Sequence, residues 1–569
     1  MPATQETWKL NTKTTQGSAS PAAEFDYIVI GAGSAGCAVA GRLAEDPTAT
    51  VALLEAGPHD HHFSVWAPVG IAAIVPKAGP RNYAYYTEPQ PGLNGRCSYQ
   101  PRGRGLGGSS SINGMVYIRG HRRDYDGWAA LGCQGWSFDD VLPYFRRSER
   151  NARLAGRGDT LHGSGGPLHV NDLRSPNPFS QRFIEAAMQA GLPRNHDFNG
   201  QSQEGVGLFQ VTQHNGERWN TARAYLHGGN AEDKALNGGR KGLAVLTDTQ
   251  ALRIMFEGKR AVGVQVVRNG SVQVLRARRE IVVSGGAFNS PQLLLASGIG
   301  PAAQLRSFGI GVVHDLAGVG ENLQDHLDII VNKQLHTTEL FGKTAGGMLR
   351  LAREVVRYRR TRTGMVTSNI AEAGAFLRSR PGLEIPDVQL HFAVALVGNR
   401  NLGKRSNLGH GYSCHACVLR PKSRGYVRLR SADMREAPLI DPRFLSAEED
   451  LAGMVAGVRA IRRIFAQPAL AQHGGRELMT EAFGSDSGNE EAIRDFVRTH
   501  ADTVYHPVGT CKMGVDDMAV VDPELRVYGV EGLRVADASV MPTLVGGNTN
   551  APAIMIGEKA ADLIKASLR

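Results

Sequence analysis

The chain has 569 residues, of which 42% are hydrophobic and 21% are charged, and its formal net charge at pH 7 is +10. This composition is typical of a soluble globular protein, and the length predicts two to four domains. No apolar run approaches the roughly 18 residues that a membrane-spanning helix needs. The basic residues are scattered and accompany no nucleic-acid motif, so we expect no nucleic-acid partner.

The start of the chain and its cysteines favour a cytoplasmic protein. Residues 1–24 are polar and lack the apolar core of a secretory signal, so we expect a disordered tail there. Six cysteines in so long a chain do not make a disulfide framework, which indicates a reducing compartment. Cys414 and Cys417 lie in a strand-like segment without a second pair to complete a zinc site. We therefore expect two buried thiols and no metal.

Residues 25–57 predict a dinucleotide-binding unit. An apolar strand over 25–30 runs into a GxGxxG turn, a small-residue helix follows over 37–43, and a second strand over 51–54 ends at Glu55. Such glycines permit a sharp turn, close approach of the backbone to a pyrophosphate and close helix packing, while the helix N-terminus offers free N–H groups. Glu55 can accept hydrogen bonds from ribose hydroxyls.

The order of these elements carries more weight than the glycine pattern. Glycine is 69 of 569 residues, so a GxGxxG occurs by chance about once in this chain, as it does at 103–108. Only the first match follows an apolar strand and precedes a helix, a second strand and an acidic residue. We therefore assign the dinucleotide to the first match.

The segments after Glu55 predict a covered ligand site. Residues 59–101 are irregular and rich in Pro, Gly and His, which is typical of a lid. The glycine- and serine-rich run 102–114 allows a cofactor to lie against the backbone. Strands are expected at 243–247, 261–266 and 280–284. The last of them leads into a second glycine turn and a helix over 292–296.

The second half predicts an inserted domain and a return to the first one. From 332 to 498, strands alternate with amphipathic helices, as expected of a substrate domain. Polar turns at 506–511 and 548–552 flank a strand at 533–539, and a helix over 553–563 closes the chain. This last segment is expected to rejoin the first domain.

One helix has two interpretations. Over 348–362, Met348, Leu351, Ala352 and Val355 fall at helical spacing, and arginines occupy other positions. The first interpretation is a surface helix docked on the core. The second is a helix lying on an anionic membrane.

With these motifs in order, the sequence resembles the glucose–methanol–choline family of FAD-dependent oxidoreductases. The two family signatures resemble Gly103–Tyr117 and Gly286–Gly300, and the paired active-site positions resemble His506 and Asn548. Within the family, Tyr117–His121 and the surroundings of both paired residues are most similar to flavin alcohol dehydrogenases of alkane-degradation pathways and to choline dehydrogenases.

The resemblance implies an α/β (α+β) fold, with a Rossmann-like FAD-binding domain and an inserted mixed-sheet substrate-binding domain. The tail, 1–24, would precede three FAD-binding parts, 25–170, 226–330 and 501–569, the last with the catalytic residues. The region 59–101 would be the lid, 171–225 a connecting segment on the substrate side, and 331–500 the substrate-binding domain.

The resemblance also implies where FAD is held. The pyrophosphate would lie on the first glycine turn, the ribose on Glu55, and the isoalloxazine beside 107–113. Some relatives carry a flavin-linking His where this chain has Ile112, so we expect noncovalent FAD. The residues expected to contact FAD are Gly31, Gly33, Ser34, Ala35, Gly36, Glu55, Ala56, Arg104, Gly107, Gly108, Ser109, Asn113, Gly114, Met115, Val116, Ala251, Asp537, Ala538, Asn550 and Ala551.

The implied chemistry is hydride transfer from an alcohol to flavin N5, with His506 as the base and Asn548 holding the alcohol oxygen. A lone His is more often a buried structural residue, but its pairing with the Asn548 motif favours catalysis. Choline oxidisers carry a Glu two residues after a His, and this chain has the shorter Asp328 there. Asp328 is therefore a candidate substrate residue that leaves choline possible.

Several functions compete. The main one is oxidation of a primary alcohol with a quinone as acceptor, by a cytoplasmic protein that lies peripherally on the inner face of the membrane. The alternatives are a choline dehydrogenase, a soluble alcohol oxidase that uses oxygen, and a non-catalytic flavoprotein. Cys37 and Cys97 do not fit a flavin disulfide reductase, and Leu419 before Arg420-Pro421 argues against a light-driven decarboxylase.

Overall fold

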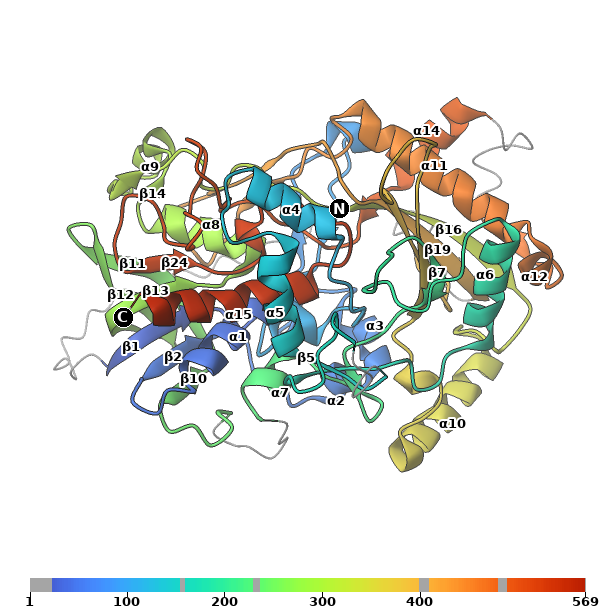
Figure 1. Cartoon of the computed structure of the whole chain (residues 1–569), viewed down its shortest axis with the longest axis horizontal. Coiled ribbons are helices and arrows are strands. Elements are labelled where there is room, and N and C mark those ends of the chain that lie inside the picture. The colour runs from blue at the N-terminus through green and yellow to red at the C-terminus, as the bar shows by residue number, and fades with distance from the viewer. Residues whose placement is uncertain (1–22, 154–158, 229–235, 399–408, 479–488, 568–569) are drawn as a thin grey trace.

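The computed structural model describes residues 23–153, 159–228, 236–398, 409–478 and 489–567. Two seven-stranded sheets organise this part of the chain. In Figure 1 the first sheet occupies the left half of the molecule and the second sheet the right half. The predicted tail lies outside the described residues except for its last two, which begin the first strand.

The first sheet has a parallel centre and an antiparallel edge. Tyr27–Ile30 are buried, and strands flank them on both sides, as expected of a strand in the middle of a parallel sheet. The strand order is β10 (Leu243–Leu246), β2 (Val51–Leu54), β1 (Ala23–Ile30), β13 (Ser271–Val283), β12 (Arg260–Arg268) and β11 (Thr249–Glu257), and β24 (Leu533–Val535) pairs with β13. The strands predicted at 25–30, 51–54, 243–247, 261–266 and 280–284 lie in this sheet, and so does the start of the strand and turn predicted at 533–539.

Two helices from opposite ends of the sequence pack together beside this sheet. They are α1 (Ser34–Leu43) and α15 (Asn550–Ala566), shown in blue and red in Figure 1. Their backbones approach so closely that a Cβ on Gly557 would stand 2.5 Å from the Ala35 carbonyl oxygen. The last described helix therefore packs against the first helix, beside the first sheet.

The helices around the cavity begin earlier than predicted. α1 begins at Ser34, α15 at Asn550 and α8 at Gly286, so turn residues form their first turns. α8 (Gly286–Ala296) takes in the predicted glycine turn because the Asp537 carboxylate accepts the Gly286 N–H at 2.8 Å.

The second sheet is antiparallel. α11 (Glu448–Phe465) and α6 (Pro178–Gln189) cover one face with an apolar core. On β18 (Val388–Ala393), Leu390 and Phe392 point into this core. Because side chains alternate along a strand, the residues between them face the first domain. The strand order is β22 (Arg476–Glu477), β16 (Leu327–Leu335), β19 (His410–Val418), β18 (Val388–Ala393), β17 (Ala371–Leu377) and β7 (Gly205–Leu208), and β23 (Asp502–Thr503) pairs with β16.

Two strands of the second sheet do not follow the predicted domain boundaries. The boundary predicted after residue 330 falls within β16, and β7 comes from the predicted connecting segment. Both cysteines of the Cys414–Cys417 pair are buried free thiols, as predicted. The domain division itself stays a prediction.

The predicted lid is a compact structure. It holds α2 (Phe63–Trp66), α3 (Ile71–Ile74), β3 (Tyr85–Tyr86) and β4 (Tyr99–Gln100).

α10 (Ala345–Thr361) projects from the lower right edge of Figure 1. Among the described residues, no helix combines the length and apolarity needed to cross a membrane.

The remaining elements are connectors and satellites. They are α4 (Arg122–Ala130), α5 (Phe138–Ser148), α7 (Thr221–Tyr225), α9 (Ala302–Ser307), α12 (Pro468–Ala471), α14 (Glu490–His500), β5 (Glu149–Asn151), β6 (Leu168–Val170), β8 (Gln213–His214), β9 (Glu217–Arg218), β14 (Ile299–Gly300), β15 (His314–Asp315), β20 (Tyr426–Arg428) and β21 (Leu439–Asp441).

Candidate active site

A cavity of about 960 Å³ is lined by residues of both sheets. At one end its wall contains Gly31, Gly33 and Glu55 from the first sheet and its turn. Further along, it contains His506 and Asn548, and beyond them residues of the second sheet. A space of this size and extent suits a dinucleotide together with a small substrate.

The first glycine turn forms a cradle for a pyrophosphate. A Cβ on Gly31 would stand 2.4 Å from the Ser284 carbonyl oxygen, and one on Gly36 1.9 Å from that of Gly31. Gly33 is different, since the nearest atom would be 4.0 Å away and the residue lines the cavity. Gly33 caps α1 without a side-chain hydrogen bond, so its neighbouring N–H groups remain for a ligand. The residues present therefore fit the phosphates of FAD.

Glu55 is oriented by the backbone around it. Its carboxylate accepts N–H groups of Ala32 at 3.0 Å, Gly57 at 2.9 Å and Gly105 at 2.8 Å. Burial raises its pKa despite these bonds. A carboxylate has about four acceptor sites, so one remains for a ribose hydroxyl at the cavity wall.

Two further segments complete the cofactor wall. Asn113 accepts hydrogen bonds from the Met115 N–H at 3.0 Å and from buried Arg218 at 2.7 Å, which fixes the backbone of this stretch. A Cβ on Gly114 would meet nothing within 4 Å, so the wall is open there. The second segment contains Asp537, whose carboxylate accepts a hydrogen bond from the Ser290 hydroxyl at 2.6 Å. This bond joins the end of β24 to α8.

Most residues predicted to bind FAD line this cavity, and a few lie behind its wall. Those behind it are Gly36, Arg104, Gly107 and Ala551, which support the wall residues next to them. Arg104, for example, donates to the Ala56 carbonyl at 3.1 Å. Those on the wall are Gly31, Gly33, Ser34, Ala35, Glu55, Ala56, Gly108, Ser109, Asn113, Gly114, Met115, Val116, Ala251, Asp537, Ala538 and Asn550.

A chain of hydrogen bonds fixes the tautomer of His506. His326 Nε2 lies 3.0 Å from the Leu419 carbonyl oxygen, which can only accept, so this nitrogen carries the proton. His326 Nδ1 is then an acceptor, and it lies 3.0 Å from His506 Nδ1, which must donate. This network leaves His506 Nε2 without a proton, 3.2 Å from the Asn548 side-chain nitrogen.

Burial keeps both imidazoles neutral. It lowers the pKa of His326 to about 3 and the pKa of His506 well below its usual value, with His326 and His391 adding to the second shift. A neutral His506 can accept a proton at Nε2. The adjacent Asn548 amide can donate to the same substrate oxygen.

The backbone at His506 is held under strain. The preceding residue, Tyr505, has φ of +74°, a conformation that costs free energy outside glycine. Its carbonyl accepts from Arg102 at 2.6 Å, and the His506 N–H donates to Asp325 at 2.8 Å. Burial raises the pKa of Asp325 to about 6. Half-buried Arg102 and buried Asp325 thus keep this turn in place.

The second sheet contributes two cavity histidines that the sequence analysis did not single out. His391 Nε2 lies 3.5 Å from the Asn548 side-chain nitrogen, and Gln389 donates to the Asn548 oxygen at 3.1 Å. His415 lies beside His391 on the neighbouring strand. The alternation of polar and apolar residues over 388–393 was the feature of the sequence that could have pointed to a polar face on this strand.

Asp328 stands behind His415. Its carboxylate accepts from His415 Nδ1 at 2.6 Å, and His415 is the member of the pair on the cavity wall. The side chain of Asp328 is only 5% exposed. A substrate in this cavity would therefore meet the imidazole and not a bare carboxylate.

The part of the cavity wall next to α10 is mostly apolar, with Lys343 as a charged member. It includes Phe341, Leu396, Val397, Met348 and Leu351. The exposed apolar residues of α10 are Met348, Leu349 and Val356, each more than half exposed. The expectation that Met348 and Ala352 pack on the core is wrong, because both are exposed while Leu351 and Val355 face the protein.

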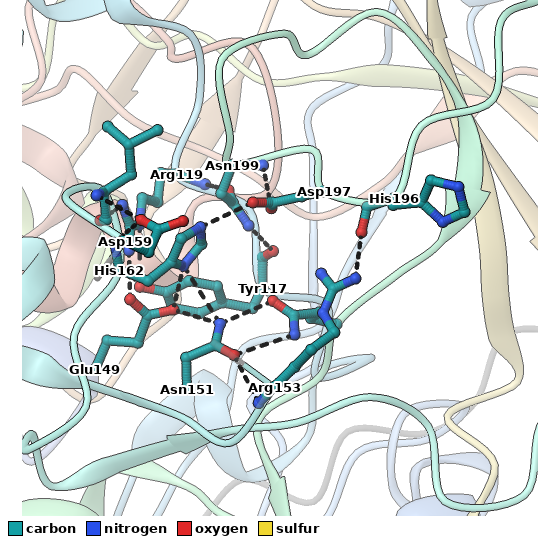
Figure 2. Close-up of polar contacts among 12 residues, drawn as sticks. Tyr117, Arg119, Glu149, Asn151, Arg153, Asp159, His162, His196, Asp197 and Asn199 are labelled. Atoms are coloured by element: carbon teal, nitrogen blue, oxygen red, sulfur yellow. Dashed lines mark hydrogen bonds and ion pairs between the residues drawn. The ribbon is translucent and has the colours of Figure 1, made fainter. Parts of the chain in front are cut away.

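A buried polar network supports the chain just beyond the cavity wall, as Figure 2 shows. Arg119 pairs with Glu149, and His162 lies between Glu149 at 3.0 Å and Asp197 at 2.9 Å. Asn199 bonds to the backbone of both Tyr117 and Arg119, at 3.0 and 2.8 Å. This network anchors the segment that continues directly from the wall residue Val116.

The chain belongs to the GMC oxidoreductase family, whose N- and C-terminal models match residues 25–328 and 421–557. It is therefore an FAD-dependent oxidoreductase. It is 44% identical over 543 residues to "Alcohol dehydrogenase [acceptor]" of Pseudomonas putida, with 95% of each chain covered. It is 45% identical over 552 residues to mitochondrial choline dehydrogenase of Homo sapiens, covering 95% of this chain and 90% of that one.

Solved structures share the fold along almost the whole chain. Pyridoxine 4-oxidase from Mesorbium loti is 31% identical, with a TM-score of 0.82 and 95% and 98% of the two chains covered. A formate oxidase of Aspergillus oryzae RIB40 is 26% identical, with a TM-score of 0.85 and 96% and 99% covered. The fold predicted from the sequence is thereby confirmed.

Proposed function

We propose that this enzyme oxidises a primary alcohol to the aldehyde, with His506 as the base. The observation that carries the proposal is the proton-free Nε2 of His506, 3.2 Å from the Asn548 amide on the cavity wall. Bound FAD supplies the hydride acceptor. His506 Nε2 takes the hydroxyl proton, and Asn548 holds the oxygen by donating a hydrogen bond. A base so positioned contributes roughly 10²–10⁴ in rate.

FAD is proposed to bind without a covalent bond to the protein. The residue before Asn113 is Ile112, whose side chain has no nucleophilic atom and packs against Val65 and Ile74. Backbone N–H groups at the α1 N-terminus and the Glu55 carboxylate would hold the cofactor. Asp537 is proposed to bond to it through the carboxylate that already orients α8.

The proposed substrate is an uncharged alcohol with an apolar tail. Two observations favour it over choline: His415 covers the Asp328 carboxylate, and the wall near Phe341 and Leu396 is mostly apolar. The name of the relative from Pseudomonas putida supports an alcohol as the substrate. The choline dehydrogenases, which are equally similar, keep choline as the second candidate.

The proposed acceptor is a membrane quinone, reached by peripheral binding of α10 at the cytoplasmic face of the membrane. The exposed apolar residues of α10 are flanked by the exposed arginines Arg353, Arg357, Arg359 and Arg360. An apolar stripe between cations suits the interface of an anionic bilayer. The same helix lies beside the mostly apolar part of the cavity wall, so an apolar alcohol could enter from the lipid.

One experiment tests the function as a whole. A panel of linear alcohols, benzyl alcohol and choline is run in parallel with an artificial dye, a soluble quinone and oxygen as acceptors. We expect aldehyde from apolar primary alcohols with dye and quinone. Turnover of choline alone would select the second candidate, stoichiometric hydrogen peroxide would identify an oxidase, and no aldehyde in any arm would contradict the proposal.

A further inference from the structure

Three side chains far from the catalytic pair converge where the lid begins. Asp60 and His61 precede α2, and His227 follows the end of α7. One donor atom from each lies within 4.8 Å of the other two. The group of residues comes from segments that are more than 150 positions apart, so the fold itself brings it together. None of the three lines the catalytic cavity.

Two buried imidazole nitrogens in this group have no hydrogen-bond partner among the described residues. His227 and Asp60 are each 1% exposed, and His227 Nε2 lies 2.9 Å from an Asp60 carboxylate oxygen. The other carboxylate oxygen accepts from Asn220 at 3.0 Å. His227 Nδ1 and His61 Nε2 are also buried, yet neither has a hydrogen-bond partner among the described residues. Buried polar atoms in proteins are nearly always satisfied, so two such atoms in one cluster indicate a missing ligand.

We propose that Asp60, His61 and His227 bind a divalent transition-metal ion of the zinc type. Imidazole nitrogens and a carboxylate are the donor set that Zn²⁺ prefers over Mg²⁺ or Ca²⁺, which select oxygen ligands. The hydrogen bond that Asp60 accepts from Asn220 orients its carboxylate, as second partners do in known zinc sites.

The charges around the cluster permit a cation. Asp60 supplies a negative charge, and the nearby Arg223 is neutralised by Glu217 at 3.0 Å and stacks between Trp66 and Trp219. The ring of His59 lies 5.5 Å from that of His61 on the exposed side, and its Nδ1 accepts the His61 N–H, so it is not counted among the ligands. The site would therefore have three protein ligands and room for a fourth.

A metal here would fasten the lid to the FAD-binding domain. The segment that starts at Asp60 continues into α2 and α3, and its residues Val69, Ile71 and Val75 line the cavity. His227 is fixed to the end of α7 on the other side. The ion would link these two parts and would take no part in hydride transfer, because the ligands lie outside the cavity wall.

The test measures metal and flavin on the same purified holoenzyme. The protein is stripped with a chelator, dialysed against Zn²⁺ and assayed by mass spectrometry for zinc per chain and by absorbance for FAD. We expect about one zinc per chain and a rise in Tm in wild type. His61→Ala should lose both effects and keep FAD, because His61 Nε2 makes no hydrogen bond that folding requires.

A neighbouring histidine provides the control. His59 is exposed and its Nδ1 accepts the His61 N–H, which an Asn side chain can replace. His59→Asn should bind zinc as wild type does. Zinc stoichiometry and Tm that are equal in wild type, His59→Asn and His61→Ala would overturn the proposal, and so would wild type that takes up no zinc. Loss of zinc in both variants would also overturn it, since it would indicate a surface histidine tract.

Discussion

At the scale of single residues, the protonation of His506 is decided by a main-chain carbonyl that it does not touch. The Leu419 oxygen fixes His326, and His326 fixes His506. A base whose free lone pair is set in advance needs no proton rearrangement when the alcohol binds.

His506→Ala is expected to lower kcat by roughly two to four orders of magnitude, because the variant lacks the positioned base. FAD content should remain that of wild type, since no predicted phosphate or ribose contact is lost. Stopped-flow reduction of the flavin by the alcohol measures the effect. A variant with near-normal kcat would assign the base elsewhere.

His326→Phe should have a smaller effect of a different kind. Without an acceptor at His326 Nδ1, His506 can place its proton on either nitrogen, and one hydrogen bond worth about 1 kcal/mol is lost. We expect kcat to fall about fivefold with little change in KM. His326→Gln, whose amide oxygen can accept, should recover part of the loss. Equal loss in both variants would show that packing, and not the tautomer, is at stake.

At the scale of elements, the network in Figure 2 makes stability depend on pH. Burial opposes a charge on His162, but the hydrogen bonds that it donates to Asp197 and Glu149 outweigh burial and raise its pKa to about 9. The unfolded value is about 6.5. The stabilisation is therefore complete below pH 6.5 and is lost as the pH rises through 9.

We expect His162→Gln to unfold at a lower Tm than wild type at pH 6 and at nearly the same Tm at pH 10. Differential scanning calorimetry of both proteins at several pH values measures this difference. Because other groups titrate as well, the quantity to compare is the difference in Tm between wild type and His162→Gln at each pH. A gap that stays constant from pH 6 to 10 would show that His162 is not the titrating group.

The prediction of peripheral membrane binding concerns α10. Co-sedimentation with anionic vesicles should occur at low salt and weaken at high salt. Replacing Arg353, Arg357 and Arg360 by Gln should remove about 1 kcal/mol for each charge. Leu349→Ser with Val356→Ser should weaken binding even at low salt, because the exposed apolar stripe would be lost. Vesicle binding that none of these changes affects would remove α10 from the proposal.

The sequence predicted local elements better than it predicted partners across sheets. The strand, glycine turn and helix at 25–43 are contiguous, so their chemistry could be read directly. His391 and His415 come together only through the antiparallel register of β18 and β19, which the sequence does not reveal. In the pairing of β19 with β16, Asp328 lies opposite Cys417, and His415, two residues away on the same face, reaches and covers its carboxylate.

At the scale of the whole molecule, the proposed catalytic pair, His506 and Asn548, joins the two halves. His506 follows β23 in the second sheet, and Asn548 precedes α15, which packs on α1. Asp325 and His326 lie just before β16, so both sheets meet at the base. FAD in the shared cavity would contact both parts, and its binding should stabilise the whole chain.

Removal of FAD is therefore expected to lower Tm, since a ligand at 1,000 times its Kd stabilises the folded state by about 4 kcal/mol. Acid precipitation should release the yellow chromophore into the supernatant at about one FAD per chain, as Ile112 offers no covalent link. Flavin that stays with the pellet would contradict noncovalent binding. Readdition of FAD to the apoprotein should restore Tm.

The alternation along β18 has a consequence for changing specificity. Leu390 and Phe392 belong to the apolar core, whereas Gln389 and His391 face Asn548 from the same strand. Every second position can thus be varied for substrate preference while its neighbours keep the domain folded. Inserting or deleting one residue in this strand would exchange the two sets and destroy both at once. A library for new alcohols should therefore randomise 389, 391 and 415 and leave the strand lengths untouched.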